Sequence, residues 1–145
     1  MESLHPLLVH FPIALLLTAV TIDLAALALK HPAWHRVALW NLTLGTLGAG
    51  AAVLSGLQAE DVGRHSFEIW QVLALHKRLG FVTLILGAMV VGWRLAVRDR
   101  LAGRTRLLAV LLGVALAASL SWGAYLGGRL VYEFGVGGSF GASEP

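Results

Sequence analysis

Four long apolar segments follow one another along the chain, separated by short polar stretches. We expect helices over 7–29, 37–57, 67–94 and 106–130. An α-helix rises 1.5 Å per residue, so about 20 apolar residues cross a hydrocarbon core of about 30 Å. Apolar side chains occupy every face of these segments, as in helices that contact both protein and lipid. The pattern predicts an all-α integral membrane protein whose single domain, residues 1–145, has four transmembrane helices.

The connections predict how the helices are arranged. The links 30–36 and 94–106 are short, so each joins two antiparallel neighbours in an up-down bundle. The connection 58–68 carries three acidic residues.

The distribution of positive charge predicts the orientation. Seven cations fall on one side of the predicted bundle: Lys30, Arg36, Arg94, Arg98, Arg100, Arg104 and Arg106. Positive residues are enriched on the cytoplasmic side of membrane proteins. We therefore expect both termini outside, in a multi-pass protein of the bacterial inner membrane.

Composition supports a membrane protein and excludes several kinds of site. The chain is 57% hydrophobic and 13% charged, and its mean hydropathy is +0.76. A soluble domain of 145 residues has too little interior for so much apolar surface. Cysteine is absent, which excludes disulfides, thiolate metal sites, iron–sulfur clusters and thioether-linked haem. The net charge of +3 gives no nucleic-acid signal, and the start lacks a signal-peptide pattern, so the first helix is expected to be retained.

Small residues recur at three- and four-residue spacing in the second and fourth segments. They are Gly45, Gly48, Ala52 and Gly56, then Gly113, Ala117 and Ser121 and, offset from these, Gly123 and Gly127. Small side chains let helix backbones approach closely in lipid. We expect tight packing inside the bundle, with a homodimer face as the alternative.

The six histidines divide into two groups. His31 and His35 fall in the inner hairpin, where we expect solvated loop residues. Four others fall toward the outer side: His5, His10, His65 and His76. Histidine at the edge of hydrocarbon is costly unless a partner satisfies it, so it marks a candidate site.

Two imidazoles facing each other across a helical bundle are typical of b-type haem. His10 lies about one turn inside the first span and His76 at a similar depth, so this pair is the expected axial set. His65 and His5 are substitutes. The cations available for the haem propionates are Lys77, Arg78, Arg64 and Arg129. Such a module would pass electrons near the outer face, to or from a periplasmic carrier or quinol.

Other interpretations of the outer histidines remain open. Pro6 and Pro12 free backbone carbonyls that His10 could bond, and His76 could be an interfacial side chain. His5, His10 and His65 could instead bind a divalent ion. A cofactor-free structural or assembly subunit of a larger complex is the alternative function. The chain has no His-Glu-x-x-His, P-loop or Gly-x-Ser-x-Gly motif, so we do not expect an enzyme acting alone.

Asp23 is an acidic residue within the first apolar segment. A carboxyl group there must be protonated or paired. We expect a hydrogen bond across to the second helix, from Asn41, Thr43 or Thr46. A proton-relay role is the alternative.

Two runs near the ends of the chain resemble a known family. Residues 5–15 read HPLLVHFPIAL and residues 127–137 read GGRLVYEFGVG. They resemble the opening and closing motifs of an uncharacterised bacterial family of small four-helix membrane proteins, a domain of unknown function. His76, on a third helix after a polar loop, also matches. The resemblance covers nearly the whole chain. It implies redox partners, namely Rieske-type or c-type cytochrome domains.

Overall fold

The computed structural model describes residues 5–58 and 66–136, without the side chains of residues 5–7. It contains α1 (His5–Ala28), α2 (Trp34–Gln58), α3 (Phe67–Ala96) and α4 (Gly103–Tyr132). All four are long and apolar enough to cross a membrane. The predicted all-helical membrane fold is therefore confirmed, and every helix boundary lies within three residues of its expected position.

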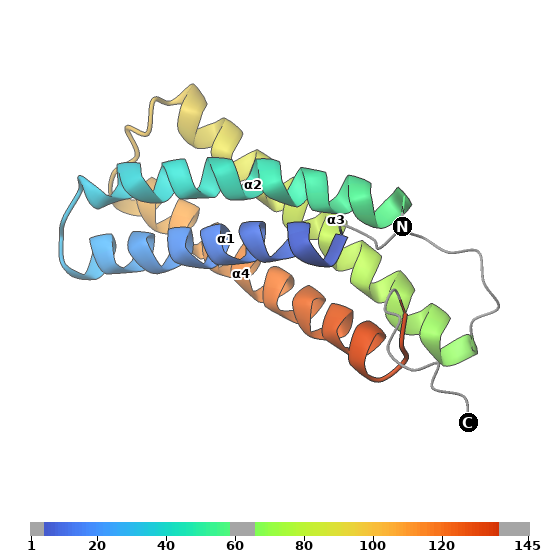
Figure 1. Ribbon diagram of the computed structural model, residues 1–145. Helices are drawn as coiled ribbons and strands as arrows, with labels where there is room; N and C mark the ends of the chain where they lie inside the picture. Colours follow the sequence, from blue (N-terminus) through green and yellow to red (C-terminus); the bar gives the residue numbers. More distant parts are fainter. Residues whose placement is uncertain (1–4, 59–65, 137–145) are drawn as a thin grey trace.

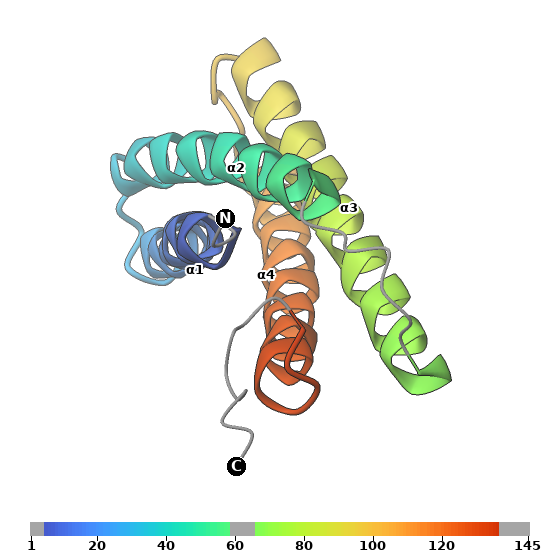
Figure 2. The ribbon, with the colours of Figure 1, turned by 45° about the vertical axis from the view of Figure 1, so that its right-hand side comes forward.

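The helices form two hairpins, α1–α2 and α3–α4, that pack against each other through α2 with α3 and α1 with α4. Helices α1 and α3 are diagonal, and their backbones make no close approach within the described residues. We call the end with the two hairpin loops the loop end, and the opposite end, where α1 begins and α4 finishes, the terminal end. Figures 1 and 2 show the hairpins inclined to each other and diverging toward the terminal end.

Two clusters of buried side chains reflect this divergence. The first takes residues from all four helices: Leu16, Ala19, Leu42, Ala49, Val90, Val91 and Leu116. The second lies nearer the terminal end and takes Val72, Leu126 and Leu130 from α3 and α4 alone. The α3–α4 hairpin therefore has an apolar core of its own beyond the region that the four helices share.

Glycines allow the close approach within the first hairpin. A Cβ atom on Gly45 would lie 2.8 Å from Cγ of Leu16, and one on Gly48 would lie 3.1 Å from Cδ1 of Phe11. Leu16 is fully buried, so it has little space in which to retreat. The predicted packing role of the small residues is confirmed for these two positions.

Candidate functional site

His76 is half-buried on α3 and is anchored to α4. Its Nδ1 lies 2.8 Å from the carbonyl oxygen of Gly123. A carbonyl oxygen only accepts hydrogen bonds, so Nδ1 carries the proton and donates it. In the neutral ring, Nε2 then keeps a free lone pair. The imidazole also lies over Gly127, where a Cβ atom would come within 3.0 Å of Cε1 of His76.

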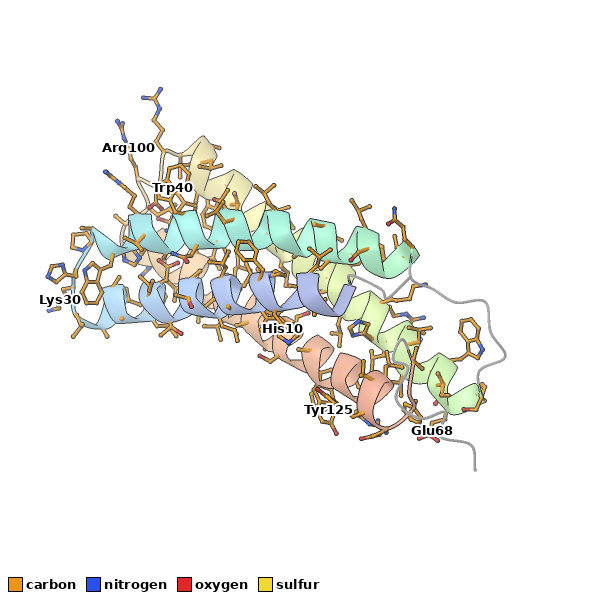
Figure 3. All side chains as sticks on the ribbon, viewed as in Figure 1. His10, Lys30, Trp40, Glu68, Arg100 and Tyr125 are labelled. Atoms are coloured by element: carbon orange, nitrogen blue, oxygen red, sulfur yellow. The ribbon has the colours of Figure 1, made fainter. Side chains whose placement is uncertain are left out.

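His10 lies on the exposed surface of α1, near the terminal end where the hairpins diverge (Figure 3). The position of His10 along the bundle axis, which we call its height, follows from the contact between α1 and α4, where Val20 faces Gly113. His10 precedes Val20 by ten residues, and Gly123 follows Gly113 by ten. Because the two helices are antiparallel, both positions lie about 15 Å from that contact toward the terminal end. His10 and the His76–Gly123 pair therefore have similar heights on separate helices.

Lys77 and Arg78, two of the cations expected around a haem, follow His76 directly in the sequence. Lys77 and Arg78 line an open groove on α3 with Trp70, Leu73, Ala74 and Phe81, and its volume is about 290 Å³. Successive residues of a helix are turned by about 100°, so this groove is on another face of α3 than His76.

Arg129 joins the terminal ends of α3 and α4. Its Nε donates to Oε2 of Glu133 at 2.7 Å, and its Nη2 lies 3.9 Å from Oε1 of Glu68. The guanidinium carbon is 5.6 Å from the centre of the Phe134 ring. Arg129 is thus already engaged with two carboxylates and an aromatic ring.

Three of the predicted outer residues fall partly or wholly outside the part of the chain that the structure describes. Arg64 and His65 lie outside the described residues, and the side chain of His5 is not described. Within residues 5–58 and 66–136, no three His, Asp or Glu side chains lie together as a metal site would require.

A second polar site lies at the loop end and is buried. Asp23, only 6% exposed, receives a hydrogen bond from Nδ1 of His35 at 2.7 Å and one from Nη1 of Arg94 at 2.6 Å. The expected partners were wrong. Asn41, Thr43 and Thr46 instead donate to carbonyl groups of their own helix.

Arg94 is the centre of this site. It is 1% exposed, and Nη2 donates to the carbonyl oxygen of His35 at 2.7 Å. Its Nε donates at 3.0 Å to Oδ1 of Asp99, in the α3–α4 loop. Arg106, near the start of α4, donates to the same Oδ1 at 2.7 Å and to the Asp99 carbonyl at 2.9 Å.

We call Asp23, His35, Arg94, Asp99 and Arg106 the ionic cluster. It takes at least one group from each of the four helices and from the loop between α3 and α4. Two carboxylates balance two guanidinium groups, so the cluster is electrically neutral when His35 is neutral. Among the described side chains, no buried polar atom lacks a hydrogen bond. Full satisfaction is what makes charges tolerable in a low-dielectric interior.

The ionic cluster corrects two expectations from the sequence. His35 is not a solvated loop residue, because it is 6% exposed and bonded to Asp23. Arg94 is not an exposed arginine of the loop. His31, in contrast, is exposed as expected and stacks on Trp34 with ring centres 5.2 Å apart. One feature of the sequence pointed to Arg94. The Asp23 carboxyl group lies within a membrane span and needs a cation, and Arg94 lies near the end of α3, which runs parallel to α1.

Comparison with known proteins agrees with the fold. A family model described as "Predicted membrane protein (DUF2231)" matches residues 1–139. The chain belongs to this family. No curated protein and no solved structure matches the chain. The family description states a membrane location and leaves function open, in agreement with the predicted uncharacterised membrane family.

Proposed function

We propose that this protein is a membrane-embedded electron-transfer module that holds a b-type haem between α1 and the α3–α4 hairpin, with His10 and His76 as axial ligands. One observation carries the proposal. His76 donates from Nδ1 to a backbone carbonyl, which leaves Nε2 as the nitrogen available to a metal. Metal-ligating histidines almost always make such a hydrogen bond with their second nitrogen, because it fixes the tautomer and the orientation of the ring.

The relation between the two histidines gives further support. An axial pair must face the iron from opposite sides at one level in the bundle. His10 and the His76–Gly123 pair have similar heights, and the helices that carry them diverge there (Figure 1). The neighbouring spans are apolar, which suits a porphyrin.

Each residue has a limited task in this proposal. Haem, when bound, supplies one-electron exchange at iron. The Gly123 carbonyl keeps the His76 ring in place, and its hydrogen bond raises the basicity of Nε2. Gly127 leaves space for the ring. Lys77, Arg78 and Arg129 are not needed as ligands, and we assign the propionates to none of them.

The proposed setting is the bacterial inner membrane, with the haem near its outer face. A carrier such as a Rieske-type or c-type cytochrome, or a quinol, would exchange electrons there. The position of the site near the terminal end supports exchange at one membrane surface, because the ionic cluster occupies the opposite end.

The test is an absorption spectrum of the full chain, purified from haem-replete cells and recorded oxidised and after dithionite. We expect a sharp α-band of low-spin haem in the reduced protein. His10→Ala and His76→Ala should each abolish it or convert it to a high-spin spectrum. His31→Ala is the matched control, because His31 is exposed at the loop end, and it should leave the spectrum unchanged.

Two results would overturn the haem proposal. One is colourless wild-type protein, and the other is an unchanged spectrum in both His10→Ala and His76→Ala. Metal analysis of the same preparation then separates the alternatives. A bound divalent ion would favour a histidine metal site, and its absence would favour a cofactor-free assembly subunit.

A further inference from the structure

The loop end carries a set of cations that the ionic cluster does not use. Asp23 pairs with Arg94, and Asp99 pairs with both Arg94 and Arg106, so the acidic residues described at this end are already engaged. Within the part of the chain that the structure describes, the other cations of this end are exposed and have no side-chain hydrogen bond or ion pair. They are Lys30, Arg36, Arg98, Arg100 and Arg104.

Arg36 lies at the head of an exposed apolar stripe on α2. The stripe continues through Trp40, Leu44 and Leu47, whose side chains are 65%, 47% and 68% exposed. Residues three and four apart share one face of a helix, so these four side chains lie one below another. In a helix that crosses a membrane, an exposed apolar face of this kind contacts lipid chains. Arg36 is therefore the polar end of a surface that lipid covers.

Arg104 has the same relation to an exposed stripe on α4. Leu107, Leu108 and Leu111 follow it at helical spacing and are 45%, 50% and 55% exposed. Helices α2 and α4 are diagonal, and their described residues make no close approach to each other. The bundle thus presents two separate lipid-facing stripes, each of which begins at an arginine of the loop end.

The positions of both arginines match the level of lipid phosphates. Trp34 and Trp40 lie before and after Arg36 on α2, about 9 Å apart along the helix, and tryptophan is enriched at the membrane interface. Figure 3 shows Trp40 at the loop end with Lys30 and Arg100. Side chains lean toward the N-terminus of a helix, and both α2 and α4 begin at the loop end. Both guanidinium groups are therefore directed toward the interface, with their aliphatic stems in apolar surroundings.

We propose that Arg36 and Arg104 each bind the phosphate of an acidic phospholipid in the leaflet at the loop end, and that an acyl chain of this lipid lies along the stripe below. The planar guanidinium group can donate two hydrogen bonds to one phosphate. The positive potential of the neighbouring loop cations favours a headgroup with net negative charge over a zwitterionic one. An acidic protein would match the charge, but it would not explain why an exposed apolar stripe lies below each arginine.

The test measures which lipid lies along each stripe. The chain has no cysteine, so Leu44→Cys and Leu111→Cys each give one position for a fluorescent label. These positions lie about 12 Å below Arg36 and about 10 Å below Arg104, respectively. The full chain is placed in vesicles of equimolar phosphatidylglycerol and phosphatidylcholine, in which one of the two lipids carries bromine near the middle of its acyl chain. Bromine quenches a label at short range, so the ratio of the two quenching efficiencies reports the local lipid preference.

We expect brominated phosphatidylglycerol to quench both labels more strongly than brominated phosphatidylcholine does. One cation near an anionic lipid surface corresponds to about a fivefold change in binding. Arg36→Gln should therefore lower the preference at position 44 by about that factor and leave position 111 unchanged, whereas Arg104→Gln should do the reverse. Each variant is the matched control for the other, because both lose one exposed cation from the same end of the bundle. Thermal unfolding checks that both variants are folded.

Three results would overturn the proposal. Equal quenching by the two lipids at both positions would show no lipid preference, and would leave the cations available to an acidic protein. An equal fall at both positions in either arginine variant would indicate a diffuse field in place of bound lipid. Loss of the preference when phosphate replaces chloride at the same ionic strength would show that the arginines take a free anion. None of these outcomes depends on whether the protein binds haem.

Discussion

Arg94 donates a 2.6 Å hydrogen bond to Asp23 and so joins α3 to α1. The backbones of these diagonal helices make no close approach in the part of the chain that the structure describes. A charged contact therefore crosses the centre of the bundle at the loop end, where side chains from all four helices meet.

Arg94→Met should be strongly destabilising, because it leaves the Asp23 carboxylate buried without its cation. Breaking a buried ion pair from one side costs about 3–5 kcal/mol. The measurement is unfolding in mixed micelles as the denaturing detergent is increased. Arg98→Met, which removes an exposed arginine of the α3–α4 loop, should be nearly neutral. The double variant D23L/R94M should be more stable than R94M, since it removes both charges, and a further loss would contradict a pairing role.

Asp23→Asn should cost less than Arg94→Met. The amide keeps an oxygen that can accept a hydrogen bond from Arg94, and Asp99 still pairs with the guanidinium group. We expect a loss of about 1–3 kcal/mol, the usual cost of a weakened buried hydrogen bond. The same unfolding assay measures it. Stability equal to that of wild type would contradict a role of the Asp23 carboxylate in holding Arg94.

Gly127→Leu should displace the His76 ring, because even a Cβ atom would lie 3.0 Å from its Cε1. Overpacking a close contact costs about 1–3 kcal/mol. Gly128→Leu is a matched control, since a Cβ atom there would meet no atom within 4 Å. Thermal unfolding in detergent compares the two variants. If they unfold at the same temperature, the close packing of His76 on α4 is wrong.

Gly45→Ala should weaken the α1–α2 hairpin. The new Cβ atom would lie 2.8 Å from two carbons of Leu16, which is fully buried. Gly92→Ala provides the comparison, because nothing lies within 4 Å of a Cβ atom there and alanine favours the helix by up to about 1 kcal/mol. We expect the two substitutions to change the melting temperature in opposite directions, and a rise for Gly45→Ala would contradict the packing.

Both termini should lie outside the cytoplasm, because cations concentrate at the loop end. A phosphatase reporter fused after Pro145 should be active only if that end is exported, whereas a fluorescent reporter that matures in the cytoplasm should stay dark. The reverse pattern would invert the membrane orientation and move the proposed haem site to the inner face.

Hydropathy was sufficient to predict the four helices, since crossing a bilayer constrains both length and composition. It could not predict the burial of His35 and Arg94, because each lies near a helix end beside exposed residues. Their burial depends on the rotation of each helix about its axis, which is set by contacts far apart in the sequence. The position of Asp23 within a span did indicate that a partner was required. The sequence alone favoured neutral groups on the neighbouring helix α2, because Arg94 is 71 residues away along the chain.

The ionic cluster joins all four helices at the loop end, opposite the proposed haem site. A rocking of one hairpin against the other that kept these ion pairs intact would pivot near Arg94. His10 and His76 lie about 20 to 27 Å along their helices from that pivot. Each degree of rocking then changes their separation by roughly 0.4 Å. Such a motion would leave the ion pairs of the cluster in place while it changed the distance between the two imidazoles.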